Sequence, residues 1–138
     1  IEKTGRFAYF IQILGQTYVN LKEFRKAKEM FSMALKFAES SHYTQIKAKS
    51  LNGLAEIYRR KKEFESALNN HYEVIELLDK IGAKCDLAEA YFQLSWTYQD
   101  MGNLSESRVN VEKAVRLFGE IEAPKQVEKV NYQLSINN

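Results

Sequence analysis

Proline, glycine and cysteine are scarce in this 138-residue sequence, which has one proline, six glycines and one cysteine. The single proline favours long, uninterrupted helices, because a proline inside a helix removes a hydrogen-bond donor and clashes with the preceding turn. The lone cysteine, Cys85, excludes an internal disulfide and favours a reducing, cytoplasmic location. We expect Cys85 itself to be partly buried and chemically inert.

Strong net charge and long apolar runs are also missing. Lys and Arg number 20 and Asp and Glu 18, so the net charge of +2 gives no reason to expect nucleic acid or an anionic membrane as a partner. The longest apolar run, residues 7–11, is far shorter than the roughly 20 residues that span a bilayer. It also lacks the flanks of a signal peptide. Because the chain begins with Ile1 rather than Met, we expect a piece of a longer protein.

Motifs for catalysis, metal binding and cofactor binding are absent from the sequence. It has no CxxC pair, no HExxH motif and no glycine-rich phosphate loop. His42 and His71 are isolated, and we expect His71 to pack within a helix. The run Arg59–Lys62 could form a phosphate or nuclear-import patch, but cations at a helix C-terminus are favoured by the helix dipole. We therefore predict a protein that is not an enzyme and holds no metal or cofactor.

The sequence repeats itself with a period of 40 residues. Residues of similar size recur in the same column of each copy. Five such columns are Ala8, Ala48 and Ala88; Leu14, Leu54 and Leu94; Tyr18, Tyr58 and Tyr98; Phe24, Phe64 and Leu104; and Ala27, Ala67 and Ser107. Because Gln93-Leu94-Ser95 recurs at 133–135, we expect one domain with repeats at about 4–43, 44–83 and 84–123 and a terminal helix at 124–138.

Each copy predicts two amphipathic helices. Apolar residues follow one another at steps of three and four, and strand-like alternation is missing. Polar tetrapeptides at 20–23, 60–63 and 100–103 separate the two halves of each copy, and turns this short join antiparallel helices. Asn103, followed by Glu106 three residues later, is typical of a helix N-cap. These observations predict an all-α fold of antiparallel helix pairs.

Small residues lie beside large ones in matching columns, which is typical of closely packed helices. Gly15, Ala55 and Ser95 share one small column. The order of small and large residues resembles the tetratricopeptide repeat. The residues that carry the resemblance are Leu14-Gly15, Tyr18, Phe24, Ala27, Phe31 and Ala34; Leu54-Ala55, Tyr58, Phe64, Ala67 and Val74; and Leu94-Ser95, Tyr98, Leu104, Ser107, Val111 and Ala114.

Three features depart from the family pattern. The first-helix Trp of the family is replaced in all three copies, its closing Pro is missing, and His71 stands where a large apolar residue is typical. The replacing residues are Ile11, Leu51 and Tyr91 for the Trp, and Glu39, Asp79 and Gly119 for the Pro. The period of 40 exceeds the commoner 34 and is similar to the long-helix variety of regulatory and scaffold proteins.

The resemblance implies a right-handed superhelical solenoid whose first helices line a concave groove. In that groove we expect a peptide or a partner helix to bind, with amides for its backbone and aromatics as anchors. The candidate partner-binding residues are Tyr9, Gln12, Gln16, Asn20, Lys49, Asn52, Glu56, Arg59, Glu89, Phe92, Trp96 and Gln99. Phe92 and Trp96 are the candidate anchors. The alternatives are that Trp96 packs on a neighbouring helix and that the polar residues are ordinary solvated surface.

Other functions remain open at this point. The family's clamp for chaperone C-termini is not expected, because cations are missing from the corresponding positions and Glu89 has the wrong sign. The chain could be a ligand-sensing segment of a larger signalling protein, in which small rotations between repeats add up. It could also self-associate through its first helix, where Phe7, Phe10 and Ile13 are apolar.

Overall fold

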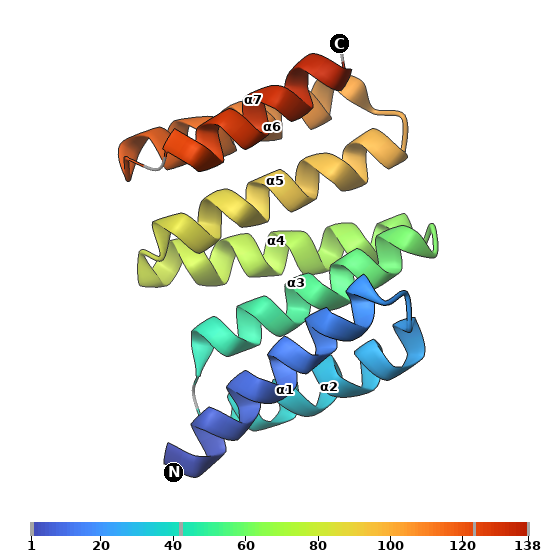
Figure 1. Cartoon of the computed structure of the whole chain (residues 1–138), viewed down its shortest axis with the longest axis vertical. Helices are drawn as coiled ribbons and strands as arrows, with labels where there is room; N and C mark the ends of the chain where they lie inside the picture. The colour runs from blue at the N-terminus through green and yellow to red at the C-terminus, as the bar shows by residue number, and fades with distance from the viewer. Residues whose placement is uncertain (1, 42, 123, 138) are drawn as a thin grey trace. The chain divides into compact units, whose positions relative to one another are not determined.

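The computed structural model describes residues 2–41, 43–122 and 124–137, and in these the chain forms seven α-helices and no strand (Figure 1). The helices are α1 (Glu2–Asn20), α2 (Phe24–Ser41), α3 (Thr44–Arg60), α4 (Phe64–Ile81), α5 (Lys84–Asp100), α6 (Leu104–Glu120) and α7 (Pro124–Asn137). The predicted all-α fold of helix pairs is confirmed. His42 and Ala123 lie outside the described residues.

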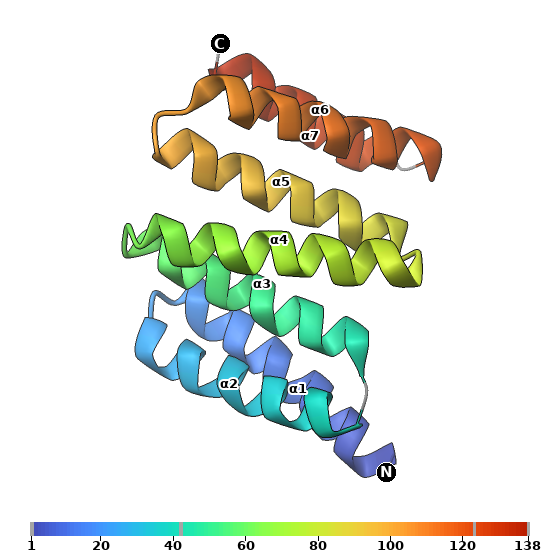
Figure 2. The ribbon, with the colours of Figure 1, turned by 180° about the vertical axis from the view of Figure 1, so that it is seen from behind.

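The helices belong to two units, with the boundary between Leu77 and Leu78 inside α4. In the first unit α1 packs against α2, and both contact α3 (Figures 1 and 2). The core of this packing consists of Val19, Ala27, Phe31, Leu54 and Ile57. Side-chain contacts also join α3 to α4, for example the Asn70 amide, which donates to the Leu51 carbonyl at 3.3 Å, and Lys47, which lies 4.0 Å from Glu73.

Phe31 of α2 explains why small residues are needed in the first unit. A Cβ placed on Gly15 of α1 would lie 2.8 Å from Cε1 of the Phe31 ring, and one placed on Gly53 of α3 would lie closer still. The ring is completely buried. The prediction that a small residue marks a close helix approach is therefore confirmed for Gly15, while the same role of Gly53 was not predicted.

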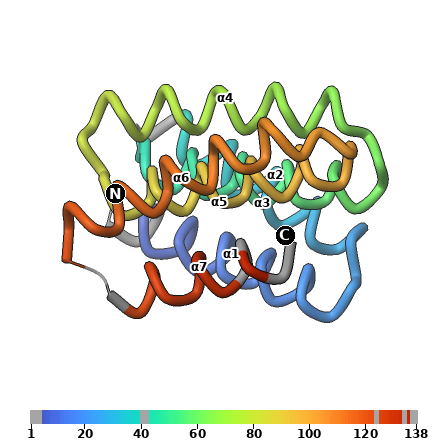
Figure 3. The backbone as a smooth tube through the Cα atoms, turned by 90° about the horizontal axis from the view of Figure 1, so that it is seen from above, coloured from blue at the N-terminus to red at the C-terminus, as the bar shows by residue number. Residues whose placement is uncertain are grey.

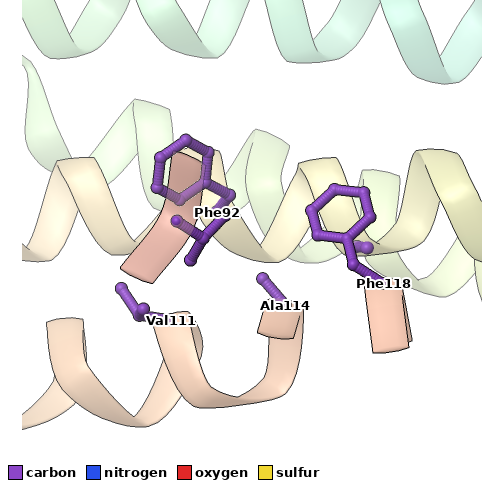
Figure 4. Close-up of a cluster of buried hydrophobic side chains, with 6 residues drawn as sticks. Phe92, Val111, Ala114 and Phe118 are labelled. Atoms are coloured by element: carbon purple, nitrogen blue, oxygen red, sulfur yellow. The ribbon is translucent and has the colours of Figure 1, made fainter. Parts of the chain in front are cut away.

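In the second unit α6 packs against both α5 and α7. Phe92 from α5, Val111, Ala114 and Phe118 from α6, and Val130 from α7 form a buried cluster (Figure 4). Trp96 packs against the outside of this cluster and is partly buried. Phe92 is 3% exposed, so it belongs to the core and not to the surface that the sequence suggested.

The turns between paired helices share one conformation. Lys22, Lys62 and Gly102 stand in one column and have φ of 62°, 62° and 83°. In each turn the amide of the next residue donates to a carbonyl five residues earlier, for example Glu63 to Tyr58 at 2.8 Å. The chain reverses direction in this way between α5 and α6 (Figure 3). The predicted turns are thus confirmed.

Several expectations about single residues can be compared with the structure. The Asn103 side chain accepts a hydrogen bond from the Glu106 amide at 3.3 Å, as predicted. His71 is buried, as predicted. Cys85 is exposed, because it lies in the first turn of α5 ahead of the first buried residue, Leu87; the expectation of partial burial was wrong. Within the described ranges no helix is both long enough and apolar enough to cross a membrane.

Candidate binding surface

The polar residues predicted on the first helices of the first unit meet where α1 contacts α3. Gln16 on α1 donates from Nε2 to Oε1 of Glu56 on α3 at 3.5 Å, and also to Oδ1 of Asn20 at 3.5 Å. Arg60 pairs with the second oxygen of Glu56 at 3.3 Å. The structure therefore brings Gln16, Asn20 and Glu56, three of the candidate residues, together. We call Gln16, Asn20, Glu56 and Arg60 the α1–α3 polar surface.

The remaining candidates of the first unit are less uniform. Gln12 is only 8% exposed, because its position on α1 faces the packed side of the helix; as a binding residue it was placed wrongly. Asn52 is partly buried, and its Oδ1 has no hydrogen-bond partner within the described ranges. Tyr9 is exposed, whereas Lys49 and Arg59 are partly buried.

In the second unit the four candidates lie along α5. Glu89 accepts a hydrogen bond from Gln93 at 3.1 Å and is partly buried, as is Gln99. The Phe92 and Trp96 rings lie 6.0 Å apart at an angle of 61°. Because Phe92 faces the cluster of α6 and α7, it is not available as an anchor. Trp96 is partly buried and packs against the same cluster, so part of its side chain remains exposed.

His71 on α4 is the one described group whose pKa is clearly shifted. Burial, and to a smaller extent the positive charge of Arg59, lower its pKa from 6.5 to about 4. The imidazole is therefore neutral near pH 7. No group of three or more His, Cys, Asp or Glu that could hold a metal ion is found in the part of the chain that the structure describes.

The structure contains a second surface that the sequence did not predict. A hollow of about 580 Å³ is lined by Arg25, Lys28, Glu29 and Ser32 of α2 and by Lys61 after α3. We call these five residues the basic hollow. The available signal was a change between copies: the column that holds Arg25 continues with Glu65 and Ser105. The local spacing of the basic run at 59–62 contains no information about α2, which is why the sequence alone does not place Lys61 beside that helix.

Comparison with known proteins identifies the repeat. Family models described as tetratricopeptide repeat match residues 8–41 and 46–120. Among curated proteins, the 43 kDa receptor-associated protein of the synapse from Gallus gallus is 24% identical over 107 residues, which are 75% of this chain and 26% of that protein. The chain thus spans about a quarter of the length of this relative.

Solved structures show the same arrangement of helices. The TPR domain of Arabidopsis FLU has a TM-score of 0.75 at 20% identity, over 85% of this chain and 98% of that one. Aspartyl phosphate phosphatase F from Bacillus subtilis has a TM-score of 0.81 at 15% identity, over 93% of this chain and 33% of that one. At such low identity the likeness concerns the fold alone.

Proposed function

The chain belongs to the tetratricopeptide repeat family, whose fold generally mediates protein–protein interactions, and we propose that it binds an extended peptide on its first helices. The observation that carries this proposal is the α1–α3 polar surface. Gln16 and Glu56 offer both a donor and acceptors across two helices, and their partly buried side chains lose less freedom on binding than fully exposed ones would. Such groups match the alternating N–H and C=O of an extended backbone.

Hydrogen bonds within the surface do not use up its capacity. A carboxylate has about four acceptor sites, so Glu56 retains acceptors for a ligand, whereas both N–H groups of Gln16 are used within the surface and its Oε1 remains as an acceptor. The two bonds at 3.5 Å are longer than the usual N–H···O distance of about 2.7–3.2 Å, so they are weak and easy to exchange for shorter ones. The surface is therefore organised before binding and still able to bind. The proposed function is non-covalent binding of a peptide and involves no covalent chemistry.

Selection of peptides followed by substitution tests this proposal. Extended peptides selected from a random phage-displayed library on the chain should bind, by fluorescence anisotropy, about tenfold more weakly to Gln16→Ala and Glu56→Gln variants. Glu76→Gln, an exposed change on α4 with the same loss of charge as Glu56→Gln, should leave the affinity unchanged. Selected peptides that bind equally well to all three variants would contradict the proposal.

A second candidate function is self-association through α1, and the exposure of its apolar residues favours it. Phe10 is 61% exposed and Leu14 38%, whereas Ser50 and Leu54, which occupy the same columns on α3, are buried under α2. The uncovered face of α1 thus corresponds to a face that is covered one repeat later. No charged residue occurs between Phe7 and Leu21, so two α1 helices could pair about a twofold axis without repulsion.

The mass of the chain in solution tests self-association. Light scattering after size-exclusion chromatography should show a dimer that a Phe10→Glu variant converts to a monomer. Leu104→Glu, which places the same charge on an exposed apolar position of α6, should leave the dimer intact. A monomer at every concentration of the unaltered chain would exclude this function.

A further inference from the structure

The basic hollow of the first unit has no role in the packing of the repeats or in the α1–α3 polar surface. Its residues on α2 follow one another at steps of three and four, and thus form one stripe on the outside of that helix. The hollow is shallow and open to solvent, with a volume of about 580 Å³, which suits a segment lying on the surface. The buried residues of α2, such as Ala27 and Phe31, lie on another stripe of the helix.

Three cations face one carboxylate in this hollow. Arg25 lies 3.9 Å from Glu29, but their side chains are 94% and 63% exposed, so water screens this pair and a ligand can displace it. Lys28 lies 5.9 Å from the centre of the Tyr58 ring, which holds its ammonium near the hollow. Lys61 completes the set from the turn after α3. The surface is therefore positively charged and partly ordered.

The position of Arg25 runs against the charge preference of the helix that carries it. The N-terminus of a helix favours negative charge, and α4 and α6 have Glu65 and Glu106 in their first turns. The first turn of α2 has no acidic residue and includes Arg25 instead. Because the three turns are otherwise built alike, the repeat fold does not require a cation there. A ligand with negative charge would offset the cost.

We propose that the basic hollow binds an acidic peptide segment. Carboxylates of such a segment would pair with Arg25, Lys28 and Lys61, while the Ser32 hydroxyl would accept a backbone N–H group. A peptide fits better than a nucleic acid, because a flexible peptide can turn its carboxylates away from Glu29, which lies among the cations, whereas a nucleic acid presents a continuous row of phosphates.

Binding of a fluorescein-labelled peptide of eight glutamates, measured by anisotropy at low salt, tests the proposal. We expect the unaltered chain to bind it, and Lys28→Gln and Lys61→Gln each to weaken binding about threefold to fivefold, and together tenfold or more. Glu29→Gln should strengthen binding, because it removes the one repelling charge. Lys80→Gln, an exposed change with the same loss of charge on α4, should have less than a twofold effect.

Four results would overturn the proposal. The first is no binding by the unaltered chain, and the second is an equal effect of Lys80→Gln and Lys61→Gln, which would indicate unspecific attraction. The third is binding of a labelled octathymidylate as tightly as the peptide, which would indicate a nucleic-acid site. A loss of binding in Lys49→Gln but not in Lys61→Gln would place the acidic peptide on the first helices instead. Circular dichroism of each variant verifies that it is folded.

Discussion

The close approach of Phe31 to two glycines leads to a prediction with an unusual sign. Alanine normally stabilises a helix interior relative to glycine by about 0.5–1 kcal/mol. In α3, however, a Cβ at Gly53 would overlap three atoms of the Phe31 ring. The ring cannot move away freely, because Gly15 on α1 contacts it from another helix. We therefore expect Gly53→Ala to destabilise the protein.

The size of the effect follows from two opposing contributions. An extra methyl group in a tightly packed core costs about 1–3 kcal/mol, and the gain in helix propensity offsets up to about 1 kcal/mol of this. Because a Cβ at Gly53 would overlap three ring atoms, we place the packing cost at about 2–3 kcal/mol, and the net loss in the free energy of unfolding should be about 1–2 kcal/mol. A Cβ placed on Gly119 of α6 would meet no other part of the described chain within 4 Å, so Gly119→Ala should keep the gain of up to about 1 kcal/mol.

Urea unfolding followed by circular dichroism measures both variants under the same conditions. A third variant identifies the cause. Phe31→Leu replaces the ring by a smaller side chain, which makes room for the new Cβ. The double variant Gly53→Ala/Phe31→Leu should therefore be more stable, by at least about 1 kcal/mol, than the sum of the two single changes predicts. Gly53→Ala that is as stable as the unaltered chain, or additivity in the double variant, would refute the reasoning from the Phe31 contact.

Two further predictions concern single residues. Burial and Arg59 lower the pKa of His71 from 6.5 to about 4, so between these pH values the unfolded chain binds a proton that the folded chain does not. The free energy of unfolding is therefore unaffected by His71 well above pH 6.5 and falls by roughly 3 kcal/mol as the pH drops to about 4. Urea midpoints against pH should show this fall, and His71→Leu should reduce it. Lys62→Gly should stabilise the turn by about 1 kcal/mol in thermal unfolding, because φ of 62° suits glycine, whereas Gly102→Ala should destabilise it by a similar amount.

The 40-residue period predicted the helix pairs and their turns because residues in one column occupy equivalent places. Ala8, Ala48 and Ala88 are all completely buried, and the turn at 100–103 has the same hydrogen bonds as the turn at 60–63. This part of the prediction required only local spacing. Neither the period nor the spacing indicates how deeply the other helices bury the residues of a given column.

The column of Gln12, Asn52 and Phe92 shows why the binding residues were harder to predict. Two of its three members are amides, which led to its placement on an exposed surface. Gln12 is 8% exposed and Phe92 3%, and the Oδ1 of Asn52 is buried, so the column as a whole faces inward. The next column, Gln16, Glu56 and Trp96, is partly buried in every copy. The inward-facing column and the partly buried one are thus only four residues apart along the helix.

Differences between copies are informative when the position stays exposed. In a buried column a change of residue can be explained by a compensating change in its neighbours. One such column holds Phe31, His71 and Val111, which differ in size and polarity although all three are buried. The column of Arg25, Glu65 and Ser105 is exposed in all three copies, so packing cannot account for its change of charge. Four of the five residues of the basic hollow lie in the first repeat, which makes that repeat the place where partners of this chain should first be sought.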